Sequence, residues 1–261
     1  MRLSAVGDFL TQMFAVADAE VVKLRHDPIE LVSRAVQPVL WLLLFGQVMA
    51  HVRGLNQSGG PYIDFLTPGV LAQSVLFVAI FYGLSAIWER DLGVLHRYLV
   101  SPAPRSALVI GKALASSARG LAQSVVIYAC AAALGVGLSF DPLRIAAVAS
   151  LIVLASALFS TFSLIIACVV RTRERFMGIG QFLTMPIFFG SNAIYPLAMM
   201  PPWLRFISRI NPLSYEVDAL RALMLRNGAA QFGLALDYAV LVAITAGLVV
   251  IATRMYPRLT E

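Results

Sequence analysis

Long apolar stretches separated by short polar segments dominate the chain. An α-helix needs about 20 predominantly apolar residues to cross the hydrocarbon core of a bilayer. On this criterion we predict six transmembrane helices, at about 31–52, 62–87, 121–138, 145–170, 176–197 and 232–253. The composition agrees, because 59% of the residues are hydrophobic and only 13% are charged, against about 25% charged residues in soluble domains. The predicted fold class is an all-α polytopic membrane protein.

Residues 1–28, before the first predicted span, show a different pattern. Apolar residues such as Leu10, Ala17 and Leu24 recur at helical spacing, and acidic and basic residues lie largely on other faces. This pattern favours an interfacial helix that lies along the membrane, with a solvated leader as the alternative. The transmembrane domain then comprises residues 29–261.

The longest charged interruption between two predicted spans runs from Ile87 to Arg105. Trp88, Leu92 and Leu95 fall at spacings of three and four, so on a helix they form an apolar stripe beside charged residues. Two prolines near the end of this stretch stop the helix. We therefore predict a short amphipathic helix at 88–100 that lies flat on the membrane.

Two short helices are predicted in residues 198–228, before the last span. A proline pair begins the first, and Asn211 and Pro212 cap and begin the second. An Asn-Gly pair at 227–228 is expected to end it. Neither helix is long or apolar enough to cross a membrane alone, so we predict re-entrant helices that dip into the outer leaflet or lie on it.

The spans themselves contain a few residues that require an explanation. Pro186 and Gly190 would let the fifth span bend or break where it faces a cavity, with Asn192 and Tyr195 near its outer end. Arg119 lies inside the third span, where a charge at the bilayer centre costs about 2.5–3.5 kcal/mol. Either it serves the transport pathway or a gate, or the helix begins near residue 107 and leaves the arginine close to the interface.

The catalytic motifs of common enzymes are missing from the sequence. It has no phosphate-binding G-x-x-x-x-G-K-[ST] loop, no G-x-S-x-G turn and no H-E-x-x-H helix. The histidines and the two cysteines have no metal-ligand spacing. We predict no catalytic, cofactor or metal site, so energy for transport must come from an ion gradient or a partner. Asp64 and Asp237 lie near span ends rather than deep within them, which favours a partner.

Two segments resemble signatures of the type-2 ABC (ATP-binding cassette) exporter permeases. Residues 89–97, with the sequence ERDLGVLHR, resemble the coupling-helix segment of that family. Residues 211–215, with the sequence NPLSY, resemble its second signature together with Asp218 and Arg221. The resemblance covers nearly the whole chain and is closest to the daunorubicin-resistance-type and nodulation-factor-type permeases.

The resemblance implies a half-size permease that works with other subunits. The expected partners are two ABC ATPase subunits, which bind ATP and Mg, and a second permease copy, either identical or similar. The chain itself would bind no cofactor and no nucleic acid. The residues implied in ATPase coupling are Glu89, Arg90, Asp91, Gly93, Leu95 and Arg97. The residues of the outer signature are Asn211, Pro212, Tyr215, Asp218 and Arg221.

Basic residues are most frequent in the loops that share a side with both termini. The positive-inside rule therefore places both termini in the cytoplasm, and the expected location is the plasma membrane, which is the inner membrane of a bacterium. Bent helices with few intramembrane charges suit an amphipathic or lipid-like substrate such as a drug, a glycolipid or a lipid-linked saccharide. A stand-alone secondary transporter or a membrane scaffold that needs no ATPase is the alternative.

Overall fold

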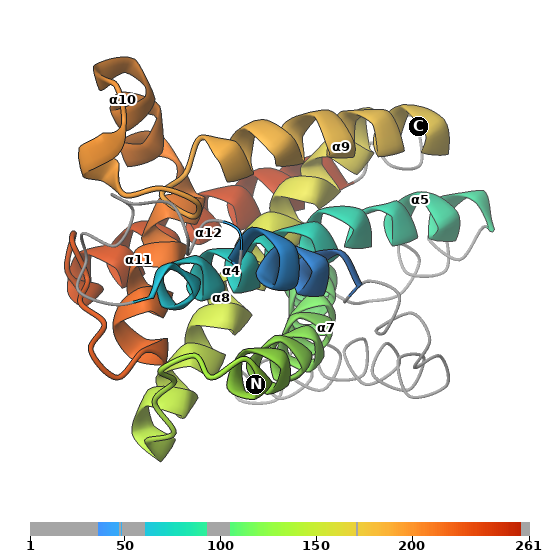
Figure 1. Cartoon of the computed structure of the whole chain (residues 1–261). Coiled ribbons are helices and arrows are strands. Elements are labelled where there is room, and N and C mark those ends of the chain that lie inside the picture. The colour runs from blue at the N-terminus through green and yellow to red at the C-terminus, as the bar shows by residue number, and fades with distance from the viewer. Residues whose placement is uncertain (1–35, 47, 49–60, 93–104, 171, 257–261) are drawn as a thin grey trace.

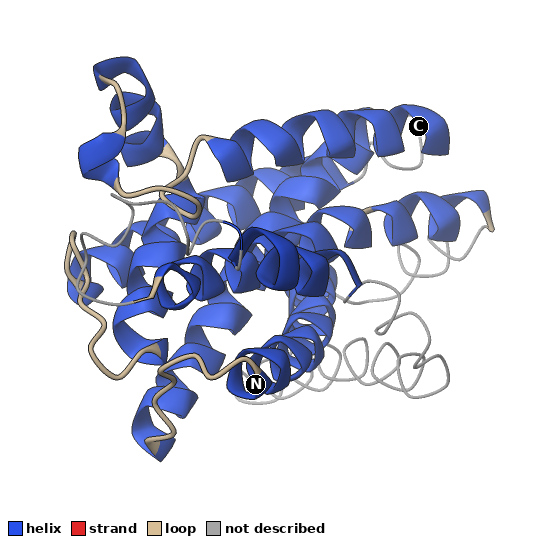
Figure 2. Ribbon diagram, viewed as in Figure 1, coloured by secondary structure: helices blue, strands red, loops and turns tan. Residues whose placement is uncertain are grey.

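The computed structural model describes residues 36–46, 48, 61–92, 105–170 and 172–256. Within these ranges the chain is a bundle of helices without a named strand (Figures 1 and 2). A first helix covers Val36–Phe45, and its second part is the π-helical segment η1, Trp41–Phe45. The other elements are α4 (Tyr62–Tyr82), α5 (Leu84–Asp91), α7 (Arg105–Ala133), α8 (Pro142–Val169), α9 (Arg173–Phe189), η3 (Leu197–Met199), α10 (Pro202–Ile210), α11 (Pro212–Met224) and α12 (Leu234–Met255).

Three of the described helices are long and apolar enough to cross a membrane. They are Tyr62–Asp91, which combines α4 and α5, then α8, and then α12. These match the predicted spans at 62–87, 145–170 and 232–253, so the all-α membrane architecture is confirmed. The total of six spans stays a prediction, because α9 has only 17 residues and part of the first span, like the interfacial helix at 1–28, lies outside the described residues.

α7 begins at Arg105, well before the predicted span at 121–138. This confirms the expectation that the third helix starts near residue 107. The early start leaves Arg119 in the middle of a helix of 29 residues.

The helices meet in two groups of buried apolar side chains. The smaller group joins the ends of α5, α8 and α12 to the beginnings of α7 and α9, and it includes Ile87, Val109 and Phe176. We call this the Glu89 end of the bundle, and it lies at the right in Figure 1. α10 projects from the opposite end, at the upper left in Figure 1, and we call that the α10 end.

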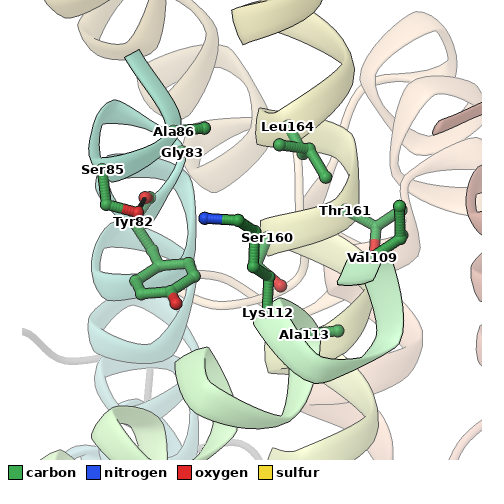
Figure 3. Close-up of a pocket in the computed structure, with 10 residues that line it drawn as sticks. All are labelled: Tyr82, Gly83, Ser85, Ala86, Val109, Lys112, Ala113, Ser160, Thr161 and Leu164. Atoms are coloured by element: carbon green, nitrogen blue, oxygen red, sulfur yellow. Dashed lines mark hydrogen bonds between the residues drawn. The ribbon is translucent and has the colours of Figure 1, made fainter. Parts of the chain in front are cut away.

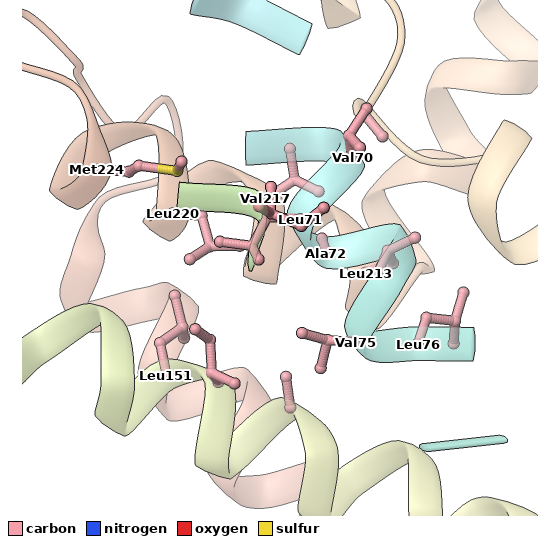
Figure 4. Close-up of a cluster of buried hydrophobic side chains, with 14 of the residues drawn as sticks. Val70, Leu71, Ala72, Val75, Leu76, Leu151, Leu213, Val217, Leu220 and Met224 are labelled. Carbon is pink, nitrogen blue, oxygen red and sulfur yellow. The ribbon is translucent and has the colours of Figure 1, made fainter. Parts of the chain in front are cut away.

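α11 occupies the middle of the larger core. Its residues Leu213, Val217 and Leu220 have no exposed surface and pack with Leu71 of α4 and Leu151 of α8 (Figure 4). Almost every side of α11 is buried, so this helix is inserted between α4, α8 and α12 rather than laid on a surface. The neighbouring α10 instead exposes apolar residues such as Trp203 and Phe206.

α11 ends at Met224, earlier than the predicted stop at 227–228. The reason is a tertiary contact, because Leu225 forms an isolated antiparallel bridge with Leu138 in the α7–α8 connection. The Ser139 amide also donates to the Met224 carbonyl at 2.8 Å. Pairing with this connection draws the chain out of the helix before the Asn-Gly pair is reached.

The chain between α9 and η3 is irregular and buried. α9 ends at Phe189, and Gly190 is its C-cap, which agrees with the predicted break after Pro186. Asn192 and Ala193 then have at most 1% exposed surface in a stretch of bends. Non-helical backbone at membrane depth is tolerated only where other parts of the protein satisfy it, and this stretch is held by α4 and α11.

We predict that Gly69→Ala destabilises the protein by about 1–3 kcal/mol, the usual range for overpacking. α4 lies directly against the irregular stretch, and a β-carbon at Gly69 would lie 2.9 Å from the Ala193 carbonyl carbon and closer still to its oxygen. The measurement is the thermal unfolding midpoint of the purified protein in one detergent.

Gly247→Ala in α12 is the matched control. A β-carbon there meets nothing within 4 Å, so this variant should keep or slightly raise the unfolding midpoint, since alanine favours a helix by about 1 kcal/mol over glycine. Equal midpoints for the two variants would contradict the close packing of α4 on Ala193.

Candidate functional site

A buried ion pair joins α5 to α7 at the Glu89 end. α5 continues α4 after a one-residue interruption at Gly83, where the Ser163 hydroxyl of α8 donates to the Ile80 carbonyl. Lys112 Nζ lies 2.6 Å from Glu89 Oε2, and these side chains are only 7% and 14% exposed. Figure 3 shows the Lys112 amino group pointing from α7 toward the side of α4 and α5. Glu89 therefore faces into the bundle.

A second, more exposed set of contacts joins α5 to α9. Asp91 Oδ2 lies 2.8 Å from Arg173 Nη2, and Asp91 Oδ1 lies 3.1 Å from Arg90 Nη2. The Arg173 guanidinium also lies over the Trp88 ring, 3.8 Å from its centroid. A cation over an indole face is attracted by about 0.5–1 kcal/mol at exposed sites.

Together these contacts tie three helices at one point. We call the five residues Trp88, Glu89, Asp91, Lys112 and Arg173 the Glu89 cluster. It includes the first part of the predicted coupling helix at 88–100. α4 and α5 form one long element, so the described part of this segment is the last part of a span. It does not begin a separate helix that lies flat on the membrane.

The remaining predicted coupling residues, Gly93, Leu95 and Arg97, lie outside the described residues. Lys112 is 23 positions from its partner Glu89, and Arg173 is 82 positions from its partner Asp91. These pairs could not be recognised from the sequence. Only helix packing brings them together.

The outer signature acts as a set of anchors for α11. Asn211 Oδ1 accepts a hydrogen bond from the Leu213 amide at 3.0 Å, so Asn211 caps the helix as predicted. Pro212 occupies the first turn of the helix. The same side chain donates from Nδ2 to the Ile187 carbonyl of α9 at 2.6 Å. Tyr215 donates to the Arg209 carbonyl of α10 at 2.6 Å.

The charged members of the signature hold α11 to more distant segments. Asp218 Oδ2 accepts from the Phe232 amide, just before α12, at 2.8 Å. Arg221 Nη2 donates to the Asn192 carbonyl at 3.1 Å, and its guanidinium lies 3.9 Å from the centroid of the Phe65 ring. The structure thus joins the signature to Asn192, which was predicted separately as a pathway residue.

The other predicted pathway residues are not gathered at this point. Tyr195 donates to the Phe189 carbonyl, and Pro186 is an exposed residue of α9. Arg119 lies over the Tyr82 ring at 5.1 Å. Since Tyr82 and Phe65 are 17 residues apart on α4, they are separated by about 25 Å along the helix, and Arg119 is remote from the signature.

Asp64 and Asp237 lie in the first turns of α4 and α12, near span ends as predicted. The sequence did not reveal, however, that Glu216, Asp218 and Asp237 have no exposed surface. Among the described residues, both oxygens of Glu216 and of Asp237 have no hydrogen-bond partner. Their burial accompanies the insertion of α11 between other helices, which periodicity does not show. Buried carboxylates are therefore present, and their position along the spans gives no argument against ion coupling.

We predict that Glu89→Gln and Lys112→Met each lower the free energy of unfolding by about 3 kcal/mol, because each leaves one buried charge without its partner. The double variant should recover much of this loss, since a buried pair replaced as a whole is often close to neutral. A double-mutant cycle by chemical unfolding measures the coupling. Additive losses would contradict a direct ion pair.

Asp91→Asn is the comparison for an exposed contact. Its side chain is 35% exposed, and exposed ion pairs contribute only about 0–1 kcal/mol. This variant should therefore unfold nearly like the wild type in the same assay.

Asn211 has two separable roles that substitutions can distinguish. Asn211→Ala removes both the cap and the bond to Ile187 and should cost about 2 kcal/mol. Asn211→Ser keeps a capping oxygen but lacks the amide donor to Ile187, so it should lose less. Unfolding midpoints measure the difference, and an equal loss in both variants would show that the cap contributes nothing.

Known proteins match this chain along most of its length. Residues 11–225 match the family model described as ABC-2 type transporter. A protein named as a transport permease, ycf38 of Cyanophora paradoxa, is 32% identical over 224 residues, covering 82% of this chain and 74% of its own length.

Two bacterial relatives are also similar. The daunorubicin resistance ABC transporter permease protein DrrB1 of Streptomyces coeruleorubidus is 28% identical over 262 residues, covering 99% of this chain and 87% of its own. The inner membrane transport permease YadH of Escherichia coli K12 is 26% identical over 200 residues, covering 73% of each chain.

The family model covers the Glu89 cluster and the whole outer signature, and the matches confirm the resemblance of the chain to this family. With its apolar helices, the chain is a membrane protein and a permease subunit. The chain belongs to the ABC-2 type transporter family.

Proposed function

We propose that this chain is the membrane-spanning subunit of an ATP-driven exporter. It moves an amphipathic or lipid-like molecule, such as a drug, a glycolipid or a lipid-linked saccharide, out of the cytoplasm or the inner leaflet. Two separate ABC ATPase subunits hold ATP and Mg and supply the energy. A second permease copy, identical or similar, completes the pathway, and the complex works by alternating access.

The observation that carries this proposal is the Glu89 cluster. The segment that resembles the family's coupling helix begins inside it, and its first acids are bonded to Lys112 on α7 and to Arg173 on α9. A force applied to this segment by an ATPase would act on α5, α7 and α9 together. In this proposal Glu89 and Lys112 fix the segment within the bundle, while Arg90 and Asp91, with Gly93, Leu95 and Arg97, meet the ATPase.

α4 and α5 connect this point to the opposite end of the bundle. The element runs from Asp91 back to Tyr62, whose hydroxyl donates to the Ile194 carbonyl in the irregular stretch after α9 at 2.8 Å. The bond from Ser163 of α8 to the Ile80 carbonyl supports the element at its Gly83 interruption. In this proposal, a displacement at the Glu89 cluster therefore reaches the irregular stretch. That stretch is the proposed gate, because the outer signature holds it through Arg221 and Asn192.

The Glu89 end is proposed to face the cytoplasm. The described residues Arg90, Lys112, Arg173, Arg175 and Arg254 gather there, and the positive-inside rule places such residues in the cytoplasm. Both termini would then be cytoplasmic, and the location would be the plasma membrane, the inner membrane in a bacterium, as the name of YadH states for that relative.

The proposal is tested by co-expressing the chain with the ABC ATPase encoded nearest to its gene. The two proteins should purify together, and ATP hydrolysis by the complex in lipid should respond to the permease. We expect Asp91→Lys to weaken the association roughly tenfold, because charge pairing at an interface fixes partner choice.

Arg209→Glu is the control, since it reverses one exposed charge on α10 at the opposite end. It should leave association with the ATPase unchanged. Normal association of Asp91→Lys would reject the docking assignment, and transport by the purified permease without any ATPase would favour a secondary transporter.

A further inference from the structure

A cavity of about 340 Å³ lies beside α4, bordered by the first described helix, α5 and α9. Pockets that bind small molecules have volumes of about 300–1,000 Å³, so this space is large enough for a small organic ligand. Its lining residues include Gln37, Gln73, Phe77, Phe81, Leu84 and Met177. We call it the Gln73 cavity.

One wall of the Gln73 cavity is aromatic and flat. The rings of Phe77 and Phe81 lie one turn apart on α4, with their centroids 5.9 Å apart and their planes 26° apart. Leu84 and Met177 extend the apolar surface, and the sulfur of methionine packs favourably against aromatic rings. This wall suits an apolar, preferably planar, ligand body.

The polar side of the cavity contains uncharged groups. Gln73 has only 2% exposed surface, and its Oε1 atom has no hydrogen-bond partner among the described residues. The amide can turn to present this acceptor to the cavity, where a ligand hydroxyl or N–H would donate to it. The described residues that line the cavity include no charged side chain, so these residues give a charged group no compensation for its lost hydration.

The cavity is open at one side. Met177 is 52% exposed and Gln37 is also exposed, whereas Gln73 is almost fully buried. The rim at the surface of the bundle therefore carries the apolar Met177 and the polar Gln37, and the Gln73 amide lies deep in the cavity. A molecule dissolved in the bilayer could enter from the side with its donor group first.

We propose that the Gln73 cavity binds an uncharged molecule with a flat apolar body and a hydroxyl or N–H donor that reaches Gln73. The identification of this ligand class as the transported substrate rests on the function proposed above. Gln73 is then the residue that selects for the donor, while Phe77 and Phe81 select for the flat body.

Two pyrene derivatives test this proposal, one with a hydroxyl donor and one in which a methyl group on the same oxygen removes that donor. The purified permease is placed in lipid nanodiscs and titrated with 1-hydroxypyrene or 1-methoxypyrene, and binding is followed by pyrene fluorescence against empty nanodiscs. The wild type should bind 1-hydroxypyrene more tightly than 1-methoxypyrene. Gln73→Leu should weaken binding of the hydroxyl compound about five- to tenfold and leave the methoxy compound unchanged.

Gln123→Leu is the matched control. Gln123 is also fully buried, and neither of its amide atoms has a hydrogen-bond partner in the part of the chain that the structure describes. It lies on α7 and is not among the described residues that line the cavity. This variant should bind both compounds like the wild type. Met177→Trp places a larger side chain at the exposed rim and should abolish binding of both compounds. This variant locates the binding site in the cavity even if Gln73→Leu does not fold.

Several results would overturn the proposal. Equal affinity of wild type and Gln73→Leu for 1-hydroxypyrene would remove the role of Gln73. Absence of binding above empty nanodiscs would show that the cavity binds neither compound. The assay contains no ATPase, so failure to associate with one would contradict the proposed function while leaving the binding result unaffected.

Discussion

The ion pair between Glu89 and Lys112 is the contact on which the arrangement of the Glu89 end depends. Two opposite charges so little exposed are stable only together, since removal of either leaves an uncompensated charge. The pair fixes the end of α5 against α7, and the Asp91–Arg173 pair then fixes it against α9. A segment bound to two other helices can transmit a displacement to all three.

The α10 end contains irregular backbone that is buried inside a membrane protein. The stretch after α9 is buried without helical hydrogen bonds, so its carbonyl groups need donors from elsewhere. Tyr62 and Arg221 supply them to Ile194 and Asn192. The outer signature therefore acts as a set of bonds that position α11 and the irregular stretch together. Asn211 caps the start of α11, and Asp218 bonds its middle to the chain before α12.

The two ends are linked by the long element formed by α4 and α5, and the Gln73 cavity lies along the same element. Its position between the Glu89 cluster and the irregular stretch would expose a bound molecule to any displacement of α4. This geometry gives the proposed exporter a single helix that contacts the coupling segment, the ligand and the gate.

The sequence by itself determined the membrane class, three of the spans, the Asn211 cap and the family resemblance of the chain. These depend on local composition and periodicity, which residues near in sequence share. Only the tertiary structure decided that Glu89 binds Lys112, that α11 is inserted in the core, and that Glu216 and Asp237 are buried. Such contacts join residues distant in the chain, and helix packing alone determines which of them meet.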